Sequence, residues 1–275
     1  MTRPWVVVLG NEKGGTGKST VSMHVVVSYL VEGNKVGTID VDARQGTLTR
    51  YLENRRKTAE SSQYALPMPE HQALFPSLSP DREQAKEEDH RAVEALFEKF
   101  ASCDVIIADT PGNNTFLSEE LHARADTLIT PINDSFIDLD MLVRIEGASK
   151  EILRPSVYAE MVWEQRKKRA SRNHGAMDWI VLRNRLTTIN AHNKGEVNRV
   201  LQALSKRIGF RIGEGFCERV IFKELFLSGL TVLDLEQVGT PMKLSHIAAR
   251  QELKSLVKMI REGEETPSKE KVAHG

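Results

Sequence analysis

Short apolar runs of strand length alternate with longer segments of helical spacing along the first two thirds of the chain. The runs lie at 6–10, 36–40, 104–110, 127–131 and 179–184. Runs that are apolar throughout are typical of strands buried on both faces, and their alternation with helices is typical of a parallel sheet. The pattern predicts an α/β fold of the phosphate-loop NTPase type, in which a mostly parallel sheet carries helices on both faces.

Two segments depart from this alternation. Residues 63–80 contain four prolines that interrupt any regular element, so we expect a surface insertion there. The residues after Arg261 have almost no apolar side chains, which is typical of disorder. We therefore expect one domain over residues 1–262, followed by a polar, disordered tail over residues 263–275.

The composition is that of an ordinary globular protein, with 275 residues, 40% apolar and 28% charged. The apolar runs are too short for a membrane span or a secretion signal, which favours a cytoplasmic location. Cys103 and Cys217 are the two cysteines and are far apart in sequence, so neither a zinc site nor a CxxC redox motif is indicated.

The stretch NEKGGTGKST, residues 11–20, follows the first apolar run and precedes a helical pattern. A strand, a glycine-rich loop and a helix in this order form a phosphate-binding loop, because backbone N–H groups and the helix N-terminus point at phosphate oxygens. Lys18 would reach the β- and γ-phosphates, Ser19 would bind Mg²⁺, and Thr20 would contact the α-phosphate. The expected nucleotide-binding residues here are Gly14, Gly15, Thr16, Gly17, Lys18, Ser19 and Thr20.

The stretch departs from the strict phosphate-loop pattern at Glu12, where that pattern has glycine, and carries a second lysine at Lys13. In this form it closely resembles the deviant Walker A motif of the ParA/MinD family of ATPases. The resemblance implies that Lys13 crosses to the other subunit of an ATP-bound homodimer and contacts the nucleotide there. A charge at this place is physically reasonable, since a shared triphosphate buried without cations would be costly.

Two further runs end in aspartates. Asp40 and Asp42 follow the second run, and Asp109 ends the third, before Thr110-Pro111-Gly112. The resemblance implies that Asp42 positions the attacking water and that Asp109 holds Mg²⁺ through water, which completes a catalytic set with Lys13 and Lys18. An aspartate after a strand is often only a helix cap, but both lie in the family's order.

Asn184 and Arg185 follow the fifth apolar run, where family members place an asparagine that recognises adenine. The resemblance therefore implies ATP rather than GTP as the nucleotide. A loop asparagine also commonly serves only to form a turn.

Within the family, segments 51–56, 131–140, 176–186, 206–216 and 245–253 resemble the MipZ division-site regulators, and the resemblance extends to about Leu256. It implies slow ATP hydrolysis and an ATP-dependent dimer that binds DNA without sequence preference, interacts with the partition protein ParB and inhibits FtsZ assembly, near the nucleoid and poles. The alternatives are a ParA-type partition ATPase without FtsZ activity, a small-substrate kinase of the dethiobiotin-synthetase kind, and a scaffold that binds ATP without hydrolysing it.

Charge is unevenly distributed, although the net charge is zero. The segment 144–223 contains 17 Lys or Arg against 8 Asp or Glu. In residues 191–208, helical spacing places an apolar stripe on one face and basic residues on the other. We expect phosphate contacts with DNA from Lys194, Arg199, Lys206, Arg211, Arg219 and Lys223, although a solvated helix face would have the same pattern. The denser basic run at 166–172 looks like a linker.

The last helical segment has an apolar stripe formed by Leu253, Leu256, Val257 and Ile260. Such a stripe suits either a membrane-surface helix or a helix packed on the domain. Because it lacks bulky aromatic residues, we expect no stable membrane binding.

Overall fold

The computed structural model describes residues 3–42, 45–133, 135–145, 152–172, 174–186, 191–218 and 220–272. Within these ranges the main sheet has seven strands in the order β3-β2-β4-β1-β5-β8-β9, and the neighbouring strands pair in parallel. The strands are β1 Trp5–Leu9, β2 Val36–Asp40, β3 Glu70–Ala73, β4 Val105–Asp109, β5 Thr127–Asn133, β8 Asp178–Asn184 and β9 Arg211–Gly213. The expected mostly parallel α/β fold is confirmed. A separate antiparallel pair is formed by β6 Val143–Ile145 and β7 Ile152–Pro155.

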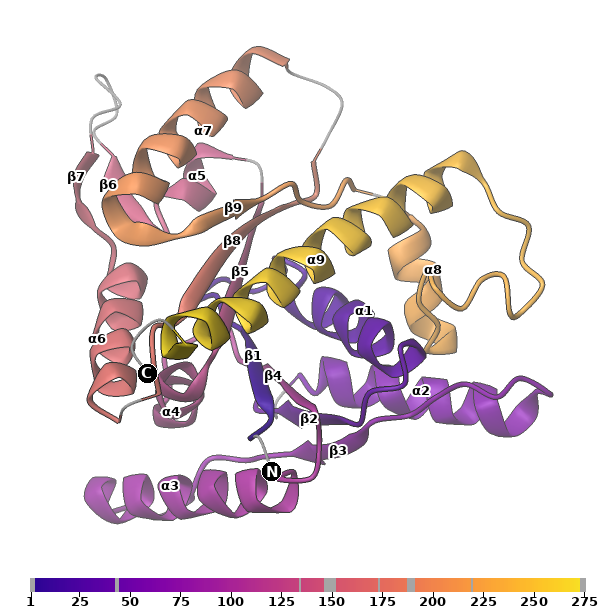
Figure 1. Cartoon of the computed structure of the whole chain (residues 1–275), viewed down its shortest axis with the longest axis horizontal. Helices are drawn as coiled ribbons and strands as arrows, with labels where there is room; N and C mark the ends of the chain where they lie inside the picture. The colour runs from indigo at the N-terminus through magenta and orange to yellow at the C-terminus, as the bar shows by residue number, and fades with distance from the viewer. Residues whose placement is uncertain are drawn as a thin grey trace.

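Helices cover both faces of the sheet (Figure 1). They are α1 Lys18–Val31, α2 Thr47–Ser61, α3 Arg82–Lys99, α4 Phe116–Arg124, α5 Phe136–Leu139, α6 Val157–Ser171, α7 Ala191–Leu204, η1 Ser205–Gly209, α8 Ile221–Ser228 and α9 Leu244–Val272. Alternate residues of β1 face opposite ways: Val6 and Val8 pack with α3, α4, α6 and α7, whereas Val7 and Leu9 pack with α1, α8 and α9. The two apolar layers explain why the strands are apolar throughout.

The apolar stripe of α9 is buried against the α1 side of the sheet. Leu253, Leu256, Val257 and Ile260 are at most 8% exposed, and α9 lies beside α1 (Figure 1). The stripe therefore serves packing in this structure. Within the described ranges, no helix has the length and apolar character that a bilayer crossing requires.

Three expectations about local structure were wrong. The insertion at 63–80 contributes the edge strand β3, because Pro67, Pro69 and Pro76 flank this four-residue strand without interrupting it. The basic run at 166–172 is not a linker but lies almost wholly in α6, where Arg169 is buried and pairs with buried Asp126 at 2.5 Å. The tail is not disordered throughout, since α9 continues as far as Val272 even though Gly263 and Pro267 lie within it.

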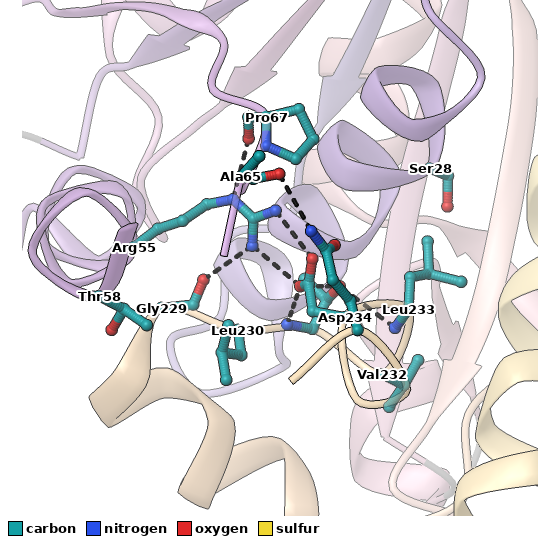
Figure 2. Close-up of polar contacts among 12 residues, drawn as sticks. Ser28, Arg55, Thr58, Ala65, Pro67, Gly229, Leu230, Val232, Leu233 and Asp234 are labelled. Carbon is teal, nitrogen blue, oxygen red and sulfur yellow. Dashed lines mark hydrogen bonds and ion pairs between the residues drawn. The ribbon is translucent and has the colours of Figure 1, made fainter. Parts of the chain in front are cut away.

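A buried ion pair connects α2 with the segment before α9. Arg55 of α2 makes a two-point contact with Asp234, at 2.8 and 2.9 Å, and also donates to the carbonyls of Gly229 and Pro67 (Figure 2). Both charged side chains are almost completely buried. Burial raises the pKa of Asp234, but the hydrogen bonds and charge of Arg55 and the bonds from Thr231 outweigh it, so the net shift is downward. The aspartate is therefore ionised, and the pair fixes α2 against the end of α8.

Candidate functional site

The three sequence motifs meet at one edge of the sheet because their strands are neighbours. β2, β4 and β1 are adjacent, and in the pairing register Asp109 lies beside Asp40 on one side and Leu9 on the other. Since parallel strands end at the same edge, the loops that follow these strands emerge together. The phosphate-loop stretch, Asp42 and Asp109 are thus brought to one site, as the sequence predicts.

The loop between β1 and α1 is closed around the ammonium group of Lys18. Lys18 is 7% exposed, and its Nζ donates to the carbonyls of Asn11 at 3.1 Å and Lys13 at 3.0 Å. Asn11 holds the loop in turn, because its side chain donates to the Pro131 carbonyl and accepts from the Lys13 N–H. Gly17 precedes α1 with φ 90°, a conformation that glycine adopts readily. The result is a preformed cradle whose lysine lies inside.

The charges at the site influence one another. Burial raises the pKa of Asp109 to about 7, opposed by a hydrogen bond from Ser19 and by the charge of Lys18. Burial lowers the pKa of Lys18, and the carboxylates of Asp109 and Asp42 raise it. The pKa of Asp42 is raised by burial, with the backbone N–H of Gln45 acting in the opposite direction. These mutual effects place Lys18, Asp42, Asp109 and Ser19 around one centre.

Two buried polar atoms at this centre have no hydrogen-bond partner, Thr16 Oγ1 and Asp109 Oδ1. Buried polar atoms are normally satisfied, so these two fit a polar ligand such as a nucleotide with its metal ion. The backbone at Gly112 approaches the loop so closely that an added Cβ would lie 3.0 Å from the Gly14 nitrogen. The Asp109–Gly112 segment therefore contacts the cradle directly, and its glycine leaves the Gly14 N–H accessible.

Lys13 points away from its own phosphate cradle. Its Nζ donates to the Ile137 carbonyl at 2.6 Å and to Asp138 Oδ1 at 3.0 Å, both in the short helix α5. The side chain of Lys13 is 36% exposed, whereas that of Asp138 is 11% exposed. The side chains of the two lysines of the motif thus lie in different places. That of Lys18 fills the loop, and that of Lys13 lies outside the loop, bonded to α5.

A cleft of 370 Å³ adjoins the cradle and has Gly17 and Thr20 in its wall. Asn184 and Arg185, the residues expected at the adenine base, line it together with Thr47, Arg50, Cys217, Glu218, Phe222, Lys223 and Phe226. The Asn184 amide donates to the Thr16 carbonyl at 2.6 Å, and its oxygen accepts from the Arg185 N–H. Beyond these bonds to described residues, the Asn184 amide has a second hydrogen and its oxygen a second lone pair with which a ligand could bond.

The six residues expected to contact DNA do not form one patch. Arg199 and Lys206 are exposed on the continuous segment α7–η1, and Lys194 lies on the same helix. Arg211 is engaged by Asp178 at 2.5 Å and Glu262 at 3.0 Å. Lys223 lies on α8 in the wall of the cleft beside Asn184, well apart from α7 (Figure 1). Arg219 lies outside the described residues.

Sequence reasoning missed several residues that shape the site. Asn11 adjoins the motif and could have been recognised as a loop-holding amide. Asp138 gave no such signal, because nothing in a pattern of spacing connects it to Lys13, 125 positions away. Phe222 and Phe226 line the cleft, but in the sequence they are indistinguishable from other apolar residues of a helix.

Comparison with known proteins extends these observations. A model of the family described as ATPase MipZ matches residues 5–262. Among solved structures, the ATP complex of an McdA variant from Cyanothece has a TM-score of 0.60 at 17% identity, covering 93% of this chain and 97% of that chain. MinD from Pyrococcus horikoshii OT3 complexed with Mg-ADP has a TM-score of 0.57 at 16% identity, with coverage of 94% and 96%. MinD from Aquifex aeolicus has a TM-score of 0.55 at 17% identity, with coverage of 94% and 97%.

A search among curated proteins gave no match. At the identities above, the solved structures bear on the fold alone.

Proposed function

The chain belongs to the MipZ family and is a ParA/MinD-type positioning ATPase, and from this premise we propose that ATP-dependent dimerisation controls which partners it binds. In this proposal residues 1–262 act as one ATPase domain. Monomer and dimer are the two states, and hydrolysis returns the dimer to monomers.

We assign the following roles within one subunit, and the geometry of the cradle supports them. Lys18 and the N–H groups of residues 14–20 bind the phosphates, and the cleft beside Asn184 and Arg185 takes the adenine base. Ser19 and Asp109 hold Mg²⁺, which neutralises charge that develops on the phosphate oxygens. Asp42 lies close enough to Lys18 to affect its pKa, and we assign it the positioning of the attacking water. The unsatisfied atoms Thr16 Oγ1 and Asp109 Oδ1 support the presence of a ligand here.

The observation that carries the dimer proposal is the separation of the two lysines. Lys18 already occupies the interior of the loop, while Lys13 is held outside it by α5. A second cation on the same loop is then available to a nucleotide that approaches from outside. In a two-fold dimer each Lys13 would reach the phosphates of the other subunit, where it compensates charge at a partly dry interface.

Dimerisation also provides a means of switching DNA binding. Arg199 and Lys206 are exposed on α7–η1, and a dimer presents two such segments at once. Non-specific DNA affinity depends on the number of neutralised phosphates, so doubling the cations raises it steeply. We further propose ParB and FtsZ as partners, with inhibition of FtsZ assembly, on the ground of family membership.

Oligomeric state tests this proposal directly. Light scattering should find monomers with ADP and dimers with a non-hydrolysable ATP analogue plus Mg²⁺, together with slow phosphate release from ATP. Single copies at all concentrations under saturating analogue would refute it.

The second candidate function is a ParA-type partition ATPase without FtsZ activity, supported by the fold shared with a solved structure described as a plasmid partition protein from Borrelia burgdorferi. Sedimentation of FtsZ polymers with and without the protein and ATP distinguishes the two, because only a MipZ-type activity reduces the pelleted FtsZ.

A further inference from the structure

A chain of hydrogen bonds leads from the edge strand β3 to the loop that carries Asp42. It begins at His71, which lies opposite Thr38 of β2 in the parallel register. Thr38 and Asp40 are two residues apart in β2, so their side chains lie on the same face of the sheet. Thr49, in the first turn of α2, completes the group on that face.

The donors and acceptors in this chain can be assigned from the geometry. The Thr49 hydroxyl donates to Asp40 Oδ2 at 2.7 Å, which uses its only hydrogen. The contact of 3.1 Å between His71 Nε2 and Thr49 Oγ1 is therefore a bond in which the imidazole N–H donates. The other ring nitrogen, Nδ1, lies 2.9 Å from the Thr38 hydroxyl, and in the neutral ring with its proton on Nε2 it accepts the hydrogen of this hydroxyl. The Glu70 carbonyl, 3.1 Å from the same hydroxyl, is the longer of its two contacts. His71 thus bridges the edge strand and the start of α2.

Asp40 passes this connection on to the loop after β2. Its Oδ2 also accepts from the Thr49 N–H at 2.9 Å, and its Oδ1 accepts from the Asp42 N–H at 3.0 Å. Asp40 and Thr38 are fully buried, whereas Asp42 lies at the margin of the site. One carboxylate therefore holds both the backbone at Asp42 and the first turn of α2, and His71 fixes the orientation of the threonine that bonds to this carboxylate.

The ring of His71 is neutral near pH 7, because burial lowers its pKa. The charges around it partly cancel: Asp40 and Glu53 raise this pKa, and Arg56 and Lys99 lower it. In both the neutral and the protonated ring Nε2 can carry a proton, so the bond to Thr49 persists in either form.

We propose that His71 is a positioning residue for ATP hydrolysis, acting through Thr49 and Asp40 to fix the backbone at Asp42. The inference rests on the proposed role of Asp42. It gives the proline-rich insertion a function, because β3 is the part of the insertion that supplies this histidine. The effect is on turnover and not on nucleotide affinity, since the hydrogen-bond chain ends at the loop of the attacking water rather than at the phosphate cradle.

Steady-state ATP hydrolysis by the full chain tests the inference. His71→Ala should lower kcat about fivefold to tenfold, which corresponds to the loss of one hydrogen bond that positions a reacting group, while KM for ATP stays within about twofold. His71→Gln retains an N–H donor near the position of Nε2 and should restore most of the turnover. Gln72→Ala changes the next residue of the same strand, whose side chain bonds to the Ala73 carbonyl and to Lys99 rather than to Asp40 or Thr49, and should behave as the unaltered protein does.

A second variant tests the same hydrogen-bond chain at another residue, so the inference can still be tested if His71→Ala fails to fold. Thr49→Val removes the hydroxyl link at nearly constant volume and should lower kcat to a similar degree. The double variant should fall no further than the lower of the two single variants, because both changes break one path.

Unchanged kcat in His71→Ala, an equal loss in Gln72→Ala, or a loss that appears in KM would each overturn the inference. Asp42→Ala, measured alongside, separates this outcome from failure of the proposed function. If Asp42→Ala hydrolyses ATP normally, the assigned role of Asp42 is wrong; if it is inactive while His71→Ala is normal, only the role of His71 is wrong.

Discussion

Lys13 and Asp138 form a salt bridge within one chain, with Nζ and Oδ1 3.0 Å apart. Lys13 is the lysine that we propose contacts the nucleotide of a second subunit, but here it bonds to α5 of its own chain. Before Lys13 can contact the nucleotide of another copy, its bonds to Asp138 and to the Ile137 carbonyl must break. In the monomer, Asp138 therefore competes with the nucleotide of a second copy for the ammonium group of Lys13, in the dimer that we propose.

Removal of that competitor should favour dimers. A partly exposed ion pair contributes about 0–1 kcal/mol, and two such pairs break for each dimer formed. Asp138→Asn should therefore lower the dissociation constant of the ATP-analogue dimer about fivefold, measured by analytical ultracentrifugation. Asp140→Asn, an exposed aspartate in the same segment, serves as the control. A dimer that is weaker in Asp138→Asn than in the control would contradict this view of the pair.

Lys13→Ala should separate nucleotide binding from dimer formation. Lys18 and the backbone of the loop remain, so a fluorescent ATP analogue should bind with nearly unchanged affinity. The dimer peak in light scattering should vanish under saturating analogue, because the charge that crosses to the other subunit is gone. Lys35→Ala removes an exposed lysine from another loop and should dimerise normally.

Asp42→Ala should trap the ATP-bound state. Loss of a group that positions and activates water lowers turnover by about 10²-fold or more. Because the phosphate cradle is intact, ATP binding and dimers should persist, and the dimer should outlive that of the unaltered protein after Mg-ATP is added. Phosphate release and light scattering measure the two effects. Glu60→Ala, exposed at the far end of α2, is the control for turnover.

The Arg55–Asp234 pair is buried between α2 and the segment before α9 (Figure 2). Asp234→Ala leaves a guanidinium buried without its carboxylate, which should lower the free energy of unfolding by about 3–5 kcal/mol. Glu236 lies two residues after Asp234 and pairs with Arg250, with its own side chain 67% exposed. Glu236→Ala should lower the free energy of unfolding by about 1 kcal/mol at most. Urea unfolding at pH 7 measures both. A similar loss in the two variants would show that burial of the Arg55 pair is unimportant.

Two buried histidines should make the protein sensitive to acid. Burial lowers the pKa of both His24 and His122 to about 4, from the ordinary value of 6.5. Above pH 6.5 these histidines are neutral in both the folded and the unfolded chain. As the pH falls from 6.5 towards 4 the unfolded chain binds the protons first, so the free energy of unfolding decreases. Between pH 7 and pH 5 each histidine should cost about 2 kcal/mol of unfolding free energy. In His122→Asn the decrease in unfolding free energy from pH 7 to pH 5 should be smaller by about 2 kcal/mol, measured by urea unfolding at both pH values.

The sequence predicts the parts of this structure that depend on local pattern. The five buried strands were found because their apolar runs must be covered on both faces, and the order of Lys18, Asp42 and Asp109 follows from the strand ends. β3 was missed because a short edge strand needs little apolar content: its residues Glu70–Ala73 are mainly polar. The basic run in α6 was mistaken for a linker because the burial of Arg169 depends on its pairing with Asp126, which is distant in sequence. Contacts such as Lys13–Asp138 and His71–Thr49 arise only from the tertiary fold.

The two edges of the main sheet are short, with four residues in β3 and three in β9. A long free edge offers unpaired N–H and C=O groups to any other chain and invites irreversible aggregation. Here little backbone is available at either edge of the main sheet, so two copies have little opportunity to adhere by strand addition. Concentrated preparations should consequently remain clear, and association should stay reversible over repeated cycles of assembly and release.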